Sequence, residues 1–130
     1  MIVIDASTVV ELLVDHGSAP RLLDLLVGET LIAPDVLPIE AASALRGLNF
    51  GGHLDSHDLD VACSDLLRLP IDLHPTLPLV PRVLALRSNF STYDASYVAL
   101  AEAFRCPLLT LDRRLAKAVR LHCDVEAVEW

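Results

Sequence analysis

Two acidic residues stand directly after short apolar runs that are typical of buried strands. Asp5 follows the run at residues 2–4, and Asp112 follows the run at residues 108–111. The carboxyl ends of parallel strands meet at one edge of a sheet, and such folds gather their functional groups there. We therefore expect the two carboxylates to lie on the same edge.

Two further carboxylates can reach this edge. Glu40 lies one turn into a predicted helix after the second strand, and Asp94 lies in the first turn of a helix that leads toward Asp112. Four carboxylates in one place repel one another unless a positive charge lies among them. Ligation by oxygen alone, without His or Cys, favours Mg²⁺ or Mn²⁺. The four acids together thus predict a Mg²⁺ or Mn²⁺ site, at which a substrate phosphate can replace waters bound to the metal.

Each acid also has a purely structural interpretation. Asp5 and Asp112 can cap the helices that follow them. Asp94 fits a capping box in the segment STYD, and Glu40 can pair with Arg46 or another base. These alternatives stay open for the single residues, whereas the convergence of all four favours a metal site.

Other catalytic chemistries have less support in the sequence. No Ser–His pair or activated Cys is evident, which disfavours a covalent route. The three cysteines form no C-x-x-C motif and predict free thiols in a reducing cytoplasm. Among the five histidines only two share helical spacing, so we expect surface or core histidines and not a zinc site. These residues are Cys63, Cys106 and Cys123, and His16, His53, His57, His74 and His122.

The composition predicts one domain spanning residues 1–130. Hydrophobic residues make up 53% of the chain, yet no apolar run approaches the roughly 18 residues of a membrane span. The N-terminus has no basic segment and Asp5 interrupts its apolar run, so we expect no secretory leader, no membrane association and a cytoplasmic location.

The net charge of −8 is unfavourable for binding nucleic acid. The charge is unevenly distributed, because residues 82–120 hold seven basic and three acidic side chains and so carry +4, whereas the rest carries −12. A protein of this kind can still hold a polyanion on one face.

Apolar runs alternate with helical patterns along the chain. Ser7 or Thr8 can cap the first helix, and Gly51-Gly52 ends the third. The alternation predicts an α/β fold of three α/β/α layers around a central parallel sheet of four to five strands. The predicted strands are residues 2–4, 30–33, 71–73, 108–111 and 125–128, and the predicted helices are residues 9–15, 19–29, 38–50, 55–69, 81–88, 94–105 and 113–120.

Two other enzyme or signalling classes also place Asp at strand ends. Haloacid-dehalogenase-like phosphatases need a second Asp two residues after the first, where this chain has Ser7. Response-regulator receivers need a lysine at the end of its own strand, and the single lysine here, Lys117, follows the last acid. Both classes are disfavoured.

Four segments resemble, in order and spacing, the signature blocks of the PIN-domain ribonucleases. They are MIVIDAST at residues 1–8, P-I-E-A-x-x-A-L at 38–45, YDASYVALA at 93–101 and LLTLD at 108–112. Within that family the chain is similar to VapC toxins of bacterial toxin–antitoxin pairs over almost its whole length. The resemblance implies a PIN-like fold, with metal-binding and catalytic acids and hydroxyls beside them. These are Asp5, Glu40, Asp94 and Asp112, with the hydroxyls of Ser7 and Thr110.

We therefore expect a Mg²⁺- or Mn²⁺-dependent endoribonuclease. Three aspartates would bind the metal, and Glu40 would hold the attacking water or help to deprotonate it. Aromatic residues are 5% of the chain, which disfavours a base-stacking platform and favours recognition of RNA shape and backbone. A basic stripe at helical spacing, formed by Arg113, Lys117 and Arg120, can follow the RNA backbone, with a solvated helix face as the alternative.

The resemblance to VapC toxins also implies the biological setting. It predicts cleavage of structured RNA, tRNA or rRNA, that inhibits translation and growth, and a VapB-type antitoxin whose chain blocks the site. It further predicts a homodimer or a toxin–antitoxin hetero-oligomer. The alternative function is a catalytically inactive PIN-fold binding module that acts through protein or RNA interaction, and the metal dependence of RNA cleavage distinguishes the two.

Overall fold

The computed structural model describes residues 1–130, which contain a fully parallel sheet of five strands. The strands are β1 (Ile2–Ile4), β2 (Leu31–Pro34), β3 (Ile71–His74), β4 (Leu108–Thr110) and β5 (Ala127–Glu129). Their order is β3-β2-β1-β4-β5, and Val3 of β1 pairs with Ile32 on one side and Leu108 on the other. The chain therefore adds two strands on one side of β1 and then returns to add two on the other. The strand order reverses at β1, next to β4.

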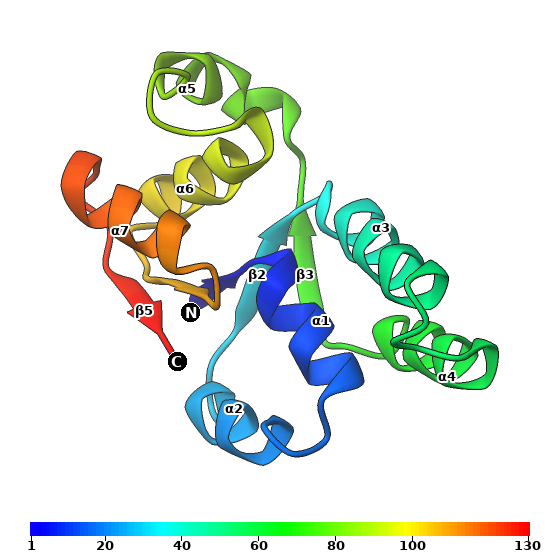
Figure 1. The fold of residues 1–130 in the computed structure, drawn as a ribbon. Coiled ribbons are helices and arrows are strands. Elements are labelled where there is room, and N and C mark those ends of the chain that lie inside the picture. The colour runs from blue at the N-terminus through cyan, green and yellow to red at the C-terminus, as the bar shows by residue number, and fades with distance from the viewer.

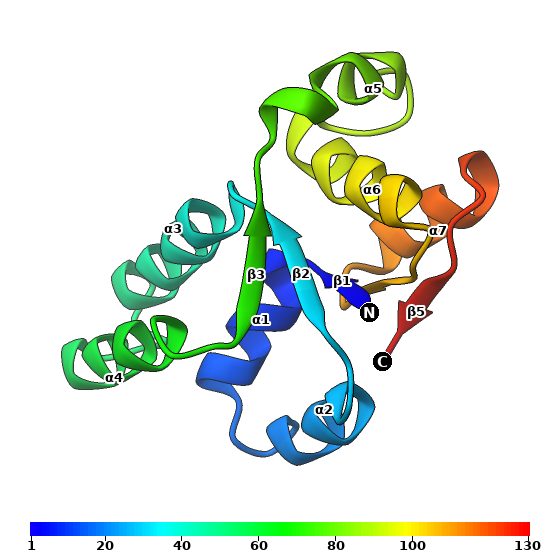
Figure 2. The ribbon, with the colours of Figure 1, turned by 180° about the vertical axis from the view of Figure 1, so that it is seen from behind.

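The helices form two groups, one on each side of the sheet (Figures 1 and 2). The first group is α1 (Ala6–Val14), α2 (Ala19–Leu26), α3 (Leu37–Phe50) and α4 (Ser56–Leu66). The second group is α5 (Val80–Ala85), preceded by the 3₁₀ turn η1 (Leu77–Leu79), α6 (Thr92–Phe104) and α7 (Arg113–His122). Helices α1, α3 and α4 pack on one another, α6 packs on β1, β2 and β4, and α7 packs on β4 and β5.

Helix α6 is the most deeply buried helix. Every residue from 95 to 101 is buried, so the middle of this helix is enclosed on all sides by the sheet and the neighbouring helices and is almost entirely apolar. The 30 buried hydrophobic residues form one continuous cluster that includes strands β1, β2 and β4. None of the helices has the length and apolar composition that crossing a membrane requires.

The predicted three-layer fold around a parallel sheet is confirmed, and several predicted boundaries are wrong by a few residues. Helix α1 begins at Ala6 because Asp5, not Ser7 or Thr8, caps it by accepting a hydrogen bond from the Thr8 amide at 3.0 Å. The helix predicted at residues 81–88 begins at Val80, since proline is well accommodated in a first turn. Helix α4 ends at Leu66, and the last strand is displaced to residues 127–129. The third helix does end at the two glycines, where Gly52 adopts a φ of 78° that favours glycine.

The packing of β4 can be tested with a matched pair of leucines. Leu109 is fully buried in β4, whereas Leu121 on α7 is 67% exposed. We expect Leu109→Ala to lower the free energy of unfolding by about 2–5 kcal/mol, because it leaves a cavity in the core, and Leu121→Ala to change it by less than about 0.5 kcal/mol. Urea unfolding of both variants measures the difference, and equal losses would contradict this location of the core.

Candidate active site

Asp5 is a buried carboxylate at the carboxyl end of the central strand, and three donors hold it. Its Oδ1 accepts hydrogen bonds from the Ser7 hydroxyl at 2.7 Å and the Thr8 amide at 3.0 Å, and its Oδ2 accepts one from the Thr110 hydroxyl. Asp5 is only 5% exposed. A buried charge of this kind is tolerated because its acceptor atoms are satisfied, so the orientation of Asp5 is fixed by the fold.

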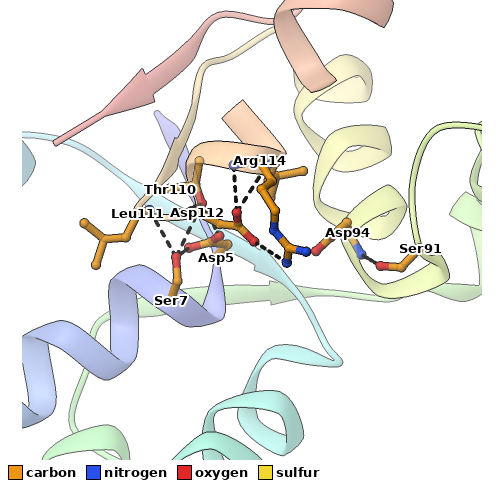
Figure 3. Close-up of polar contacts among 9 residues, drawn as sticks. Asp5, Ser7, Ser91, Asp94, Thr110, Leu111, Asp112 and Arg114 are labelled. Carbon is orange, nitrogen blue, oxygen red and sulfur yellow. Dashed lines mark hydrogen bonds and ion pairs between the residues drawn. The ribbon is translucent and has the colours of Figure 1, made fainter. Parts of the chain in front are cut away.

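The same hydroxyls join the end of β1 to the loop after β4. The Ser7 hydroxyl accepts from the Leu111 amide at 3.1 Å, and the Thr110 hydroxyl accepts from the Asp112 amide at 3.0 Å. Figure 3 shows this network around Asp5, at the reversal point of the strand order. The two hydroxyls therefore fix the distance between the segments that carry Asp5 and Asp112.

Asp112 begins α7 and faces a cation. Its Oδ1 accepts from the amides of Arg114 and Leu115 at 2.9 and 3.2 Å, and its Oδ2 lies 3.5 Å from the Arg114 guanidinium. In Figure 3 the Arg114 side chain lies between Asp112 and Asp94. The guanidinium is thus the positive charge closest to this pair of acids.

Asp94 and Glu40 complete the group of acids from two further helices. Asp94 lies in the first turn of α6, whose N-cap Ser91 accepts a hydrogen bond from the Asp94 amide at 3.1 Å. Glu40 lies in the first turn of α3 and points inward, since its Oε1 is buried. All four acids line one cavity of about 160 Å³, together with Ala6, Ser7 and Tyr97.

The electrostatics of this cavity follow from burial and like charge. Burial raises the pKa of Glu40, the Tyr97 hydroxyl opposes this rise, and the charges of Asp94 and Asp5 add to it. Burial also raises the pKa of Asp94, with the Ser91 hydroxyl lowering it and Asp112 among the charges that raise it. Burial raises the pKa of the Tyr97 hydroxyl, and the negative charge of Glu40 raises it further. The cavity therefore favours groups that keep a proton, or a cation that replaces one.

The structural interpretations are confirmed for Asp5 and Asp112, which cap helices. The capping box predicted at Asp94 is only half formed: the Asp94 amide donates to the Ser91 hydroxyl, but the Asp94 carboxylate accepts no hydrogen bond from the Ser91 amide. The pairing of Glu40 with Arg46 is wrong, because the Arg46 guanidinium lies over the Phe50 ring, 4.6 Å from its centre. An acid can cap a helix and also line the shared cavity, because helices that follow parallel strands begin at the same edge of the sheet.

The cavity offers only oxygen atoms to a cation. Its lining contains four carboxylates and two hydroxyls but no His or Cys, which is the donor set that Mg²⁺ and Mn²⁺ prefer. As the side chains stand, no three acidic, His or Cys side chains lie close enough to hold an ion together. Asp112 pairs with Arg114, so binding an ion next to Asp5 requires the side chains of Asp112 and Arg114 to separate. Arg114 is exposed and can move away into solvent.

The predicted basic stripe lies on α7 and is partly engaged by the last strand. Arg113 pairs with Glu129 at 3.3 Å and Arg120 pairs with the same carboxylate at 3.2 Å. Arg120 also donates to the Ala127 carbonyl at 3.0 Å. Lys117 is exposed and forms no ion pair. In the free protein two of the three stripe residues thus bind β5.

Sequence reasoning missed two residues of the site. Tyr97 lies three positions after Asp94, so both are on the same face of α6, and this spacing could have indicated that Tyr97 reaches the cavity. Arg114 stands two residues after Asp112, but nothing in the sequence indicated that its side chain turns back toward the acids.

Comparison with known proteins identifies the family. Residues 2–121 match the family described as PIN domain. This chain is a PIN-domain protein. It is 38% identical over 128 residues to Ribonuclease VapC9 of Mycobacterium tuberculosis, covering 98% of each chain. It is 35% identical to Ribonuclease VapC12 of the same organism, covering 98% of this chain and 99% of the relative. The PIN-domain chain therefore belongs to the VapC ribonucleases, and the predicted toxin endoribonuclease of a toxin–antitoxin pair is confirmed at the level of the family.

Solved structures confirm the fold of this PIN domain. VapBC2 from Rickettsia felis, bound to a DNA fragment from their promoter, matches with a TM-score of 0.73 and 13% identity, covering 100% of this chain and 99% of the other. VapC20 from Mycobacterium tuberculosis, described as a Sarcin-Ricin loop cleaving toxin, matches with a TM-score of 0.67 and 13% identity, covering 91% and 95%. At these identities the likeness concerns the fold.

The raised pKa values predict how the stability of the metal-free PIN domain depends on pH. The unfolded chain releases the carboxyl protons of Glu40 and Asp94 near pH 4, whereas the native state retains them to higher pH. These groups therefore make the free energy of unfolding fall as pH rises from about 4 through the raised native pKa values, and the loss is complete above them.

Substitution of Asp94 isolates its contribution to the pH dependence of the free energy of unfolding. We expect Asp94→Asn to show a smaller fall in stability with rising pH than the wild type, because asparagine does not ionise. Asp24→Asn, at an exposed position on α2, should follow the wild-type curve. Urea unfolding in EDTA across a pH series measures this, and identical slopes for all three proteins would contradict the burial of Asp94.

Proposed function

We propose that this VapC-type protein is a Mg²⁺- or Mn²⁺-dependent endoribonuclease and the toxin component of a type II toxin–antitoxin system. The observation that carries the proposal is the meeting of four carboxylates, from four separate segments, in one cavity at the reversal point of the sheet. Helix caps and ion pairs do not account for the presence of all four in one cavity, whereas a shared divalent cation would account for it.

The residues present fit such a cation. Asp5, Asp94 and Asp112 would hold it, and Glu40 would act next to it, since its Oε1 is buried without a hydrogen-bond partner. A bound divalent cation supplies stabilisation of phosphate charge and lowers the pKa of a water molecule. Glu40 would take up the proton of the attacking water, since burial raises the pKa of its carboxyl and a general base gains from a pKa closer to the operating pH. The hydrogen bonds from Ser7 and Thr110 keep Asp5 in place throughout.

The basic side chains near the cavity would bind the RNA backbone. Arg114 is 93% exposed on its side chain and can leave Asp112 for a phosphate, to which a guanidinium donates two parallel hydrogen bonds. In the stripe, Arg113 and Arg120 can exchange Glu129 for phosphates, since exposed ion pairs are weak, and Lys117 is already available. Backbone binding of this kind suits a folded RNA such as tRNA or rRNA.

The partners follow from the VapC relatives. We propose that residues 1–130 act as one domain in the cytoplasm, where a VapB-type antitoxin blocks the cavity. We also propose a homodimer or a toxin–antitoxin hetero-oligomer as the working assembly. The names of VapC9 and VapC12 and the solved VapBC2 complex support this setting.

Cleavage assays test the proposed reaction. We expect Asp94→Asn to reduce RNA cleavage about a hundredfold or more, because it removes a ligand charge, and Glu40→Gln to reduce it less. Asp24→Asn should cleave at the wild-type rate. Wild-type cleavage should require Mn²⁺ or Mg²⁺ and stop in EDTA. Cleavage that is indifferent to EDTA and to Asp94→Asn would refute the metal-dependent enzyme, and a wild type that binds RNA without cleaving it would support the binding module.

Metal binding can be measured without substrate. At ten times its Kd, Mn²⁺ should add about 1.4 kcal/mol to the free energy of unfolding, which corresponds to a rise in Tm of roughly 5 °C for a domain of this size. The rise should shrink in Asp94→Asn. Asp94 is the suitable residue, because replacing Asp5 also removes hydrogen bonds within the fold. Thermal unfolding with EDTA and with Mn²⁺ compares the proteins, and equal gains would exclude Asp94 as a ligand.

A further inference from the structure

Two buried polar atoms in the active-site cavity have no hydrogen-bond partner. They are the Tyr97 hydroxyl and Glu40 Oε1. Tyr97 is 1% exposed, and both residues line the same cavity. Buried polar groups without partners are rare, because each costs about 1–3 kcal/mol. Two such groups in the lining of one cavity indicate that they form hydrogen bonds when the site binds its metal ion and substrate.

The two groups are complementary. A tyrosine hydroxyl retains its proton at neutral pH and donates it to hydrogen bonds, whereas an ionised carboxylate accepts only. The hydroxyl lies close enough to the Glu40 carboxyl to influence its ionisation, yet no hydrogen bond of normal geometry joins them. The terminal torsion of glutamate is broad, so the Glu40 carboxyl is free to turn toward the hydroxyl.

The other hydroxyl of the cavity is already engaged. The Ser7 hydroxyl donates to Asp5 and accepts from the Leu111 amide. Three of the four acids also have partners of their own or lie beside Arg114, whereas Glu40 has neither a cap nor an ion pair to orient it. Tyr97 is therefore the one hydroxyl in the lining that can orient Glu40.

We propose that Tyr97 is a positioning residue for the ribonuclease reaction, and that its buried hydroxyl donates a hydrogen bond to the Glu40 carboxylate and holds it toward the cavity. This rests on the proposed function, in which Glu40 takes the proton of the attacking water. Helix α6 is fixed by burial on all sides, so it provides a rigid support from which Tyr97 restrains a side chain on the separate helix α3.

The test is Tyr97→Phe, alone and combined with Glu40→Gln. Phenylalanine keeps the ring in the core and removes only the hydroxyl, so the Tm in EDTA should stay the same or rise. We expect the kcat for RNA to fall about tenfold or more, with KM and the Kd for Mn²⁺ unchanged, because the hydroxyl orients the group that takes up the proton and not the aspartates that would hold the metal. In the Glu40→Gln background the same substitution should leave the kcat unchanged, because no carboxylate remains to be oriented.

Tyr93→Phe is the matched control. Tyr93 is the other tyrosine of the chain, on the same helix and 58% exposed, and its substitution should leave the kcat for RNA unchanged. Isothermal titration with Mn²⁺ and steady-state cleavage give the two readouts. Losses of equal size in both Glu40 backgrounds, or a Tm in EDTA that falls, would overturn the role of Tyr97. A wild type that binds no Mn²⁺ and cleaves no RNA would overturn the proposed function as well, whereas a Tyr97→Phe variant that cleaves RNA at the wild-type rate would overturn only the present inference.

Discussion

A carboxylate buried at the end of the central strand is the constraint on which the rest of this structure depends. Asp5 cannot be solvated by bulk water, so the fold must provide its donors, and it does so from α1 through Ser7 and Thr8 and from β4 through Thr110. Satisfying this one group requires β4 to lie beside β1 with its hydroxyl facing the first helix. The strand order reverses where β1 pairs with β4. This one pairing therefore provides the hydrogen-bond donors of Asp5 and also sets the location of the cavity.

The other three acids lie around Asp5 and differ in how firmly their side chains are held. Asp112 is held by two amides but shares its outer oxygen with a guanidinium, Asp94 is half-buried at the start of the rigid helix α6, and Glu40 has no partner of its own. The acid at the centre is therefore the least mobile, and those that must adapt to an ion or a substrate have more freedom. This gradient suits a site in which preorganised groups stabilise charge while one group moves a proton.

The fold and the acids could be predicted from sequence because they depend on local patterns. Apolar runs that end in Asp5 and Asp112 indicate strands and their carboxyl edge, and the segment around Asp94 indicates a helix start. The partners of the side chains could not be predicted, because they depend on three-dimensional packing. Glu129 pairs with two residues of the basic stripe because β5 lies beside α7 in the folded protein. In the sequence Tyr97 is indistinguishable from an ordinary core residue, and only the packing of α3 and α6 around one cavity brings it to the site.

Under the proposed function, the use of Asp5 and Asp112 both as helix caps and as members of the acidic group affects how this protein can lose its activity by mutation. A substitution at Asp5 removes a helix cap and leaves the Thr110 hydroxyl without its acceptor, so it lowers the amount of folded protein as well as any activity, and quality control degrades unstable chains. The Asp94 carboxylate caps no helix and accepts no hydrogen bond from another segment of the fold. Under selection against a harmful chain, escape mutants at Asp5 would therefore be lost from the cell, whereas escape mutants at Asp94 would persist as intact, inactive protein still able to bind a partner and keep it from active copies.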